Sequence, residues 1–229
     1  MIYIVIPARG GSVGVPDKNI LEVDGTPLLI HALRVAQALP LSNKEIVLST
    51  DSESYLQLAV EAGYSHHNLR PAHLSTSKAH VVDAVLYELA TFSPAADDMV
   101  LLLEPSFFPR DDQNIVRAIS LVSENMYDSI FGAARVPGKF HYQKQYRVTD
   151  GLAEQVAGLP NINRQQLEVT YNRSGEFYLS RYDFVEMSHS FFGGRLGILE
   201  TCGSHVNIDD ATDVERLWAI VDAHVQTQK

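Results

Sequence analysis

Charged and glycine residues lie directly behind the N-terminal apolar run MIYIVI. The following stretch, PARGGSVGVPDKN at residues 7–19, combines two cations with three glycines: Arg9, Gly10, Gly11, Gly14 and Lys18. Glycine lets backbone amides approach an anion closely, and the two cations add full positive charge. The stretch therefore predicts a loop that binds a polyphosphate. The alternative is a tight turn between a strand and a helix, because the spacing matches neither the Walker A pattern nor GxGxxG.

The elements that must position this loop follow from the hydrophobic pattern. Apolar runs predict strands at 2–6, 45–49 and 99–103, and apolar stripes at helical spacing predict helices at 27–39, 55–62 and 81–92. Alternating strands and helices indicate a parallel sheet, whose ligand site lies at the carboxyl ends of the strands. The glycine-rich loop leaves the first strand at that end.

The chain changes character after residue 131. Residues at about 137–175 are polar, aromatic and rich in turn residues, too long for an ordinary loop and too aromatic for a disordered linker. They predict an inserted arm with strands of its own that packs on a second subunit. We expect one domain over residues 1–229, completed by a strand at 175–180, a helix at 182–187, a strand within 195–200 and a helix at 210–224.

Composition argues against several classes of partner. The formal net charge of −10, without any block of Lys and Arg, argues against nucleic acid. No apolar run approaches the roughly 18 residues needed to cross a bilayer, and Met1 leads into a strand instead of a signal segment. With Cys202 as the only cysteine, no disulfide can form within one chain. We expect a cytoplasmic protein that binds neither nucleic acid nor a membrane.

Segments spread over nearly the whole chain resemble one enzyme family. IPARGGSVGVPDKN is similar to the signature of the cytidine monophosphate (CMP)-sialic acid synthetases, the N-acylneuraminate cytidylyltransferases. Further segments follow that family in order: LSTDSE at 48–53, RPAHLS at 70–75, LLLEPSFFPR at 101–110, RQQL at 164–167, SGEFYL at 174–179, SFF at 190–192 and VNIDDATDVE at 206–215. From these segments the chain is identified as a divergent member.

The resemblance implies both a fold and a reaction. The fold is a Rossmann-like nucleotidyltransferase: an α/β three-layer sandwich with a mainly parallel sheet and a small dimerisation excursion. The reaction transfers CMP from CTP to the anomeric hydroxyl of a nine-carbon keto sugar acid, and pyrophosphate leaves. Mg²⁺ is implied as cofactor because the chemistry needs positioning and charge neutralisation more than a covalent nucleophile. The family also implies a homodimer.

The resemblance assigns roles to individual residues. Catalysis falls to Arg9, Lys18 and Asp209. The nucleotide is bound by Ala8, Arg9, Gly10, Gly11, Ser12, Lys18, Asn19 and Arg70. The sugar acid is bound by Glu104, Lys144, Arg164, Tyr178, Phe191 and Phe192, with Arg164 reaching its carboxylate across the dimer interface. Asp209 and Asn207 take the metal.

Each group also has a plainer structural interpretation. The three aromatic residues could be ordinary core residues. Asp209 and Asp210 stand before a helical segment and could cap its N-terminus. Arg70 could cap carbonyl groups at the end of a strand, and Arg164 could be a solvated residue of the arm.

Three positions depart from the family pattern. Val13 replaces a lysine near the triphosphate, Asn207 replaces an aspartate of the metal pair, and Glu104 replaces a glutamine that faces the sugar. The retained residues favour an enzyme for a modified nonulosonic acid, similar to legionaminic or pseudaminic acid, over sialic acid itself. The alternatives are a catalytically weakened homologue that binds nucleotide or sugar, and a transferase for Kdo, the eight-carbon acid.

Overall fold

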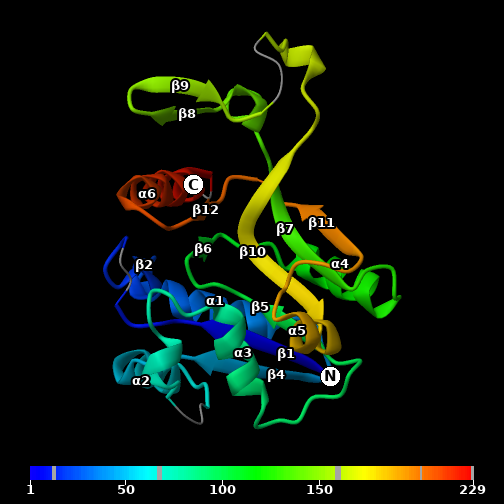
Figure 1. Cartoon of the computed structure of the whole chain (residues 1–229). Helices are drawn as coiled ribbons and strands as arrows, with labels where there is room; N and C mark the ends of the chain where they lie inside the picture. Colours follow the sequence, from blue (N-terminus) through cyan, green and yellow to red (C-terminus); the bar gives the residue numbers. More distant parts are fainter. Residues whose placement is uncertain (12–13, 66–68, 158–160, 202, 228–229) are drawn as a thin grey trace.

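A six-stranded mixed sheet forms the centre of the computed structural model, which describes residues 1–11, 14–65, 69–157, 161–201 and 203–227 (Figure 1). Its strand order is β11, β7, β10, β5, β1, β4, with bounds β1 (Ile2–Pro7), β4 (Lys44–Ser49), β5 (Met99–Leu102), β7 (Ser129–Arg135), β10 (Tyr171–Arg181) and β11 (Leu196–Glu200). The pairs β1–β4, β1–β5 and β7–β11 are parallel, whereas β10 is antiparallel to both neighbours. The predicted α/β fold with a mainly parallel sheet is confirmed.

Helices cover both faces of the sheet, which gives three layers. One face carries α1 (Leu28–Ala38), α2 (Glu53–Glu61) and α4 (Asp112–Ser123), and the other carries α3 (Val81–Leu89) and α5 (Tyr182–Ser188). Alternating strand residues supply the two cores, since Ile4 packs with the first set of helices and Val5 with the second. The three predicted crossover helices are therefore confirmed as α1, α2 and α3.

A third, smaller core lies under the C-terminal helix α6 (Ala211–Thr227). Leu217 of α6 packs there with Leu28 and Val206, and the short strands β2 (Glu22–Val23), β3 (Thr26–Pro27), β6 (Phe107–Phe108) and β12 (Val206–Asn207) border it. The antiparallel β6–β12 pair joins the loop after β5 to the segment before α6. In the described part of the chain, no helix combines the length and apolarity needed to cross a bilayer.

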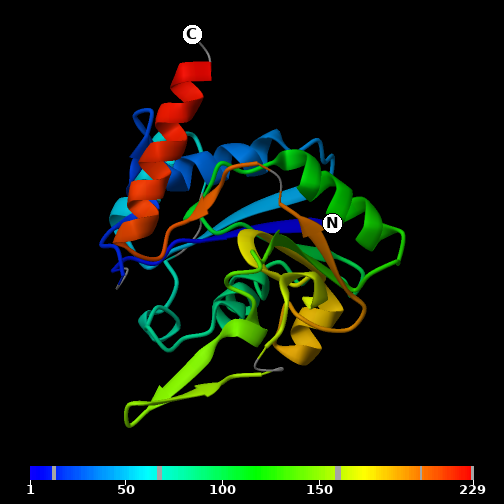
Figure 2. The same cartoon turned by 90° about the horizontal axis from the view of Figure 1, so that it is seen from above.

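The ends of β7 and β10 extend beyond the body of the protein and carry an arm (Figures 1 and 2). The arm holds a hairpin of β8 (Tyr146–Thr149) and β9 (Leu152–Gln155). Its two turn residues, Asp150 and Gly151, have φ of 51° and 80°, as a two-residue hairpin turn requires. Val148 and Leu152 are 68% and 74% exposed, so the hairpin presents apolar side chains to solvent.

The Asp128 carboxylate, which follows α4, links two segments that are far apart in the sequence. Asp128 accepts hydrogen bonds from the Arg195 backbone N–H at 2.8 Å and from its guanidinium at 2.8 Å. These bonds, the side-chain bond above all, lower the pKa of Asp128 to about 2. The ionised carboxylate therefore stabilises the folded chain.

We expect Asp128→Asn to lower the free energy of unfolding by about 1 kcal/mol at pH 7. The folded pKa lies below the ordinary value of 3.8, so the contribution is present above about pH 4 and is lost as pH falls towards 2. Urea unfolding of both proteins across this range measures the gap. An equal gap at pH 7 and near pH 2 would contradict the assignment.

Candidate active site

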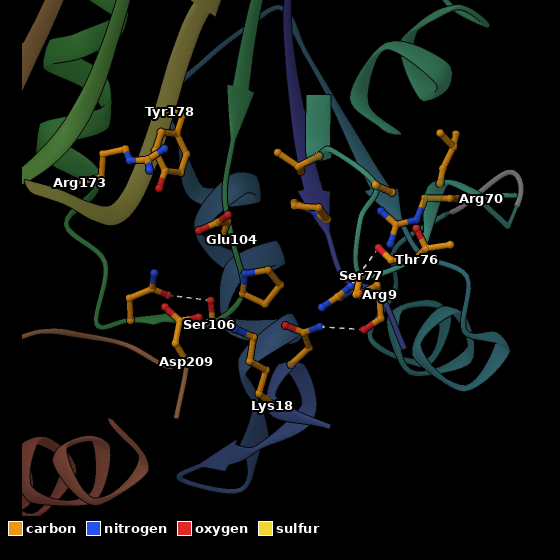
Figure 3. A pocket seen from close by; sticks show the side chains of 17 residues that line it. Arg9, Lys18, Arg70, Thr76, Ser77, Glu104, Ser106, Arg173, Tyr178 and Asp209 are labelled. Atoms are coloured by element: carbon orange, nitrogen blue, oxygen red, sulfur yellow. Dashed lines mark hydrogen bonds and ion pairs between the residues drawn. The ribbon is translucent and has the colours of Figure 1, made fainter. Parts of the chain in front are cut away.

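A cleft of about 550 Å³ opens at the carboxyl ends of β1 and β5 (Figure 3). The loops after these strands form its floor, the segment from Arg70 to Val81 forms one wall, and β10 and β12 form the other. Four of the described lining side chains are cationic and two are acidic: Arg9, Lys18, Arg70, Arg173, Glu104 and Asp209. A chain with a net charge of −10 therefore gathers positive charge at one site, as the binding of an anion requires.

Lys18 and Asp209 meet in this cleft, although they are 191 positions apart in the sequence. Lys18 begins the 3₁₀ turn η1 (Lys18–Ile20), and its Nζ donates to the Asp209 carboxylate at 2.9 Å and to the Ile208 carbonyl at 2.7 Å. The Asp209 side chain is 72% exposed. The carboxylate is therefore open to a cation from solvent, whereas the Lys18 side chain is largely covered.

The two adjacent aspartates before α6 have different roles. Asp210 accepts hydrogen bonds from the backbone N–H groups of Thr212 at 2.8 Å and Asp213 at 3.1 Å, which is an N-terminal cap. Asp209 instead directs its carboxylate to Lys18. The capping interpretation holds for Asp210 and leaves Asp209 available to the cleft.

The glycine-rich loop is held by a carboxylate that sequence reasoning did not assign. The Gly10 N–H donates to Asp51 Oδ1 at 2.8 Å, and the same oxygen lies 3.9 Å from Arg70 Nη2. Asp51 lies two residues after the end of β4, so its position after a strand of the parallel sheet was an available signal. The glycine amides of the loop were predicted to face a bound anion, and at Gly10 the amide instead binds a carboxylate of the protein.

Arg9 and Arg70 are fixed by different sets of contacts. Arg9 donates to the Thr76 carbonyl at 3.1 Å, and Asn19 donates to the Arg9 carbonyl at 3.2 Å. Arg70 is buried and donates through Nε to the Ser75 hydroxyl at 3.0 Å. Burial lowers the pKa of Arg70, but a guanidinium stays charged at neutral pH. Arg70 is therefore a permanent, oriented cation in the cleft wall.

A bend in β10 forms the opposite end of the cleft. The pairing of β10 with β7 shifts register between Arg173 and Tyr178, and Gly175 within this bulge has a φ of 86°. Residues 173 and 178 would point to opposite faces of a regular strand, yet both line the cleft (Figure 3). The Arg173 guanidinium lies 4.7 Å from the centre of the Phe192 ring, and that ring packs edge-on against Tyr178.

Glu104 lies half-buried on the floor between these two ends (Figure 3). Burial is the main cause of the raised pKa of Glu104, and the positive charges of Lys18, Arg110 and Arg173 oppose it. Burial also raises the pKa of Tyr178, and the charge of Glu104 adds to that shift. Tyr178 is therefore a neutral phenol at pH 7.

Buried polar contacts hold the loop that carries Glu104. Arg110 donates to the carbonyls of Glu104 at 2.6 Å and Glu176 at 2.7 Å, and burial lowers the pKa of Arg110 to about 10. Ser106 donates to the Asn207 side-chain oxygen at 2.8 Å. The floor of the cleft and the segment leading to Asp209 are thus joined by hydrogen bonds as well as by the β6–β12 pair.

Comparison with known proteins identifies the fold family. The family model described as cytidylyltransferase matches residues 3–209. The chain belongs to the cytidylyltransferase family. It is 29% identical over 197 residues to the N-acylneuraminate cytidylyltransferase of Streptococcus agalactiae serotype III (strain NEM316), which covers 83% of this chain and 46% of that protein. The predicted resemblance is confirmed at this level.

Two further comparisons agree with this family. The chain is 37% identical over 122 residues to the CMP-N,N'-diacetyllegionaminic acid synthase of Legionella pneumophila (strain Philadelphia 1), covering 52% of each. This chain spans about half the length of both curated relatives. A solved structure of CMP:2-keto-3-deoxy-manno-octonic acid synthetase complexed with CTP has the same fold, with a TM-score of 0.71 at 14% identity over 97% of this chain and 99% of that one.

Eight of the sixteen residues predicted for the site line the cleft. Its lining includes Arg9, Lys18, Asn19, Arg70, Glu104, Tyr178, Asn207 and Asp209. Gly10 and Gly11 lie in the adjoining loop, and the buried Ala8 packs in the core just before it. Ser12 and Val13 lie outside the described residues, so the predicted effect of Val13 stays a prediction.

Four residues predicted for the sugar lie apart from the cleft lining. Phe191 is 4% exposed in the core beneath α3 and α5, which supports its core interpretation, whereas Phe192 is 37% exposed beside Tyr178. Lys144 and Arg164 lie on the arm, in the 3₁₀ turns η3 (Tyr142–Lys144) and η4 (Arg164–Gln166). Arg164 lines a separate cavity there of about 370 Å³.

The structure adds lining residues that sequence reasoning left without a role. Those with polar or charged side chains are Thr76, Ser77, Ser106 and Arg173. Thr76 and Ser77 follow the RPAHLS segment, and Ser106 follows the strand β5, so both segments carried a positional signal. Arg173 carried none, because only the bulge in β10 brings it to the cleft.

Proposed function

We propose that this protein transfers CMP from CTP to the anomeric hydroxyl of an acylneuraminate-type keto sugar acid. The observation that carries the proposal is the Lys18–Asp209 pair beside Arg9 in a cationic cleft. Arg9 and Lys18 bind the triphosphate, and Asn19 and Arg70 hold the nucleotide. Tyr178 and Phe192 form an apolar wall for the sugar. The names of the two curated relatives, which specify N-acylneuraminate and N,N'-diacetyllegionaminic acid, support this substrate class.

The reaction forms one bond and breaks another at the α-phosphorus of CTP. The anomeric oxygen attacks that phosphorus and loses its proton to water, and the bond to the bridging oxygen of pyrophosphate breaks. Lys18 and Arg9 stabilise the negative charge that develops on the departing phosphates, because fixed cations in a cleft are already oriented for it. The walls align sugar and nucleotide, which removes much of the entropic cost of their encounter.

The residues around Asp209 fit a Mg²⁺ ion shared with the substrate. Mg²⁺ is usually held by one or two carboxylates together with substrate phosphates and water. Asp209 offers an exposed carboxylate and Asn207 a neutral side-chain oxygen, and the described residues form no cluster of three or more metal-binding side chains. When bound, Mg²⁺ would neutralise phosphate charge. CTP would have to supply the remaining ligands.

The acceptor and the rate are part of the same proposal. We propose that the acceptor binds at the end of the cleft beside Tyr178, here called the acceptor end. We assign the enzyme to a modified acid of the legionaminic or pseudaminic type because Glu104 faces this end. The second candidate is a homologue that binds nucleotide or sugar without turnover, and Asn207 favours it because a hard cation prefers a carboxylate. The related acid Kdo is a third acceptor to test. We place the reaction in the cytoplasm.

A pyrophosphate-release assay tests the function directly. CTP and three other nucleoside triphosphates are crossed with N-acetylneuraminic, legionaminic and pseudaminic acids and Kdo in the presence of Mg²⁺. We expect release only with CTP and a nine-carbon acid. Tight CTP binding without release from any pair would support the binding homologue instead.

The arm is proposed to complete the site of a second subunit in a homodimer. Its exposed Val148 and Leu152 would pack on the partner, and Arg164 would reach the partner's sugar. A mixed dimer of Arg164→Ala and Lys18→Ala chains then contains one intact site. We expect each mixed dimer to have about half of the activity of a wild-type dimer. Either variant alone should be inactive. Light scattering reports the mass, and a mixture as inactive as its components would contradict the exchange.

A further inference from the structure

The acceptor end of the cleft contains two opposite charges that do not pair with each other. The carboxylate of Glu104 has no hydrogen bond or ion pair to any described residue, and the hydrogen bonds from Arg110 and Phe107 go to its backbone carbonyl. The Arg173 guanidinium contacts the Phe192 ring and likewise has no hydrogen bond or ion pair within the described part of the chain. Figure 3 shows both side chains on the Tyr178 side of the cleft.

The other charges near Glu104 are already engaged. Lys18 donates to Asp209 and to a backbone carbonyl, and Arg110 donates to two backbone carbonyls. Arg173 is therefore the one cation among those acting on Glu104 that has no oxygen partner in the described part of the chain. A half-buried carboxylate without an oxygen or nitrogen partner is costly to leave unpaired, and the exposed Arg173 guanidinium beside it is open to a ligand oxygen, so a ligand is expected to engage both.

We propose that Glu104 and Arg173 select a zwitterionic acceptor, a keto sugar acid that carries an amino or amidino substituent. Arg173 binds the carboxylate of the acid from within the subunit, a role that the family resemblance gave to Arg164, and Glu104 binds the positively charged nitrogen group. This inference rests on the proposed function and narrows its substrate. It also assigns a specificity role to Arg173 within the same subunit as Lys18.

The side-chain chemistry of Arg173 and Glu104 suits these two assignments. A guanidinium presents several N–H donors in one plane and matches a carboxylate, and the Phe192 face keeps that plane oriented. A neutral acetamido group would leave the negative charge of Glu104 without a cation. An acetamidino group has the same shape and carries the positive charge that Glu104 lacks. A site built around a polar contact rejects the analogue that lacks it more strongly than an apolar pocket does.

Two acceptors that differ at one nitrogen test the proposal. One carries an acetamido group and the other an acetamidino group, and kcat/KM is measured for each by pyrophosphate release with CTP and Mg²⁺. We expect the wild-type protein to prefer the acetamidino acid by about tenfold or more. Glu104→Gln, which keeps the shape of the side chain, should remove or reverse this preference. Most of the change should lie in KM.

Arg173→Met tests the second contact. Methionine can still pack on the Phe192 ring, so the variant removes the charge with little loss of packing. We expect KM to rise about tenfold for both acceptors while KM for CTP stays unchanged. Arg117→Met on the exposed face of α4 is the matched control and should alter neither value.

The outcomes separate this inference from the proposed function. Turnover with an unchanged preference in Glu104→Gln, or a wild-type preference for the acetamido acid, would overturn the inference and leave the function standing. Unchanged acceptor KM in Arg173→Met would overturn the role of Arg173. The absence of pyrophosphate release with every acid, including the four of the general assay, would overturn the proposed function and this inference together.

Discussion

Lys18→Met is expected to lower kcat/KM for pyrophosphate release by about 10³-fold. Its ammonium group is held by the Asp209 carboxylate at 2.9 Å and the Ile208 carbonyl at 2.7 Å, so it is oriented before any ligand arrives. Loss of one preoriented donor to a developing negative charge typically costs about 10²- to 10³-fold. The variant also leaves Asp209 without its cation, which adds to the loss.

The fold should survive this change. Asp209 is 72% exposed, so water can solvate its carboxylate when Lys18 is absent. We expect circular dichroism and the melting temperature to stay close to wild type while the activity falls. Lys78→Met is the matched control, because Lys78 is exposed on the segment that forms the cleft wall but does not line the cleft. A loss below tenfold in a folded Lys18→Met protein would remove Lys18 from the triphosphate site.

Gly14→Ala is expected to lower kcat/KM by about 100-fold through a different route. A Cβ atom at Gly14 would clash with the Asp209 carbonyl oxygen, which is backbone and cannot rotate away. The loop or the segment that carries Asp209 must then move. A displacement of about 1 Å in a positioned catalytic group can cost about 10²-fold in rate.

Gly10→Ala gives the contrast within the same loop. Its Cβ would meet the Ser52 Cβ at 3.4 Å, which is ordinary contact, and its N–H can still donate to Asp51. We expect this variant to lose less than tenfold. Steady-state kinetics and thermal melts of both variants make the comparison. Equal losses in the two would show that any side chain in the loop is harmful and that the contact with Asp209 is not the cause.

Prediction from sequence succeeded where one local pattern dominates. β1 is a run of apolar residues buried on both faces, and α1 places its apolar side chains at spacings of three and four. α4 and β7 were not predicted. α4 places Ile115, Ala118, Ile119 and Val122 at helical spacing, so its signal was available in the sequence and was overlooked. β7 contains the small residues Gly132, Ala133 and Ala134, which give a weak strand signal.

The residues of the candidate site also differ in whether the sequence alone could assign them. Arg9, Lys18, Asn19 and Asp209 were recognised because they belong to contiguous motifs, and the fold brings them to one cleft. Phe191 and Phe192 are neighbours in one motif, but only the structure separates a core side chain from one at the cleft. Asp209 and Asp210 are chemically alike, and only their hydrogen bonds distinguish the helix cap from the residue that faces Lys18.

The sequence by itself determined the α/β order of the elements, the cationic glycine-rich loop and the family. These depend on the periodicity of apolar residues and on motifs short enough to be read along the chain. The tertiary structure alone decided that Asp51 holds the loop and that Arg173 joins Glu104 at the acceptor end. The first depends on two strands ending side by side, and the second on a bulge that turns Arg173 to the face of Tyr178. Contacts of both kinds arise only when distant segments pack together.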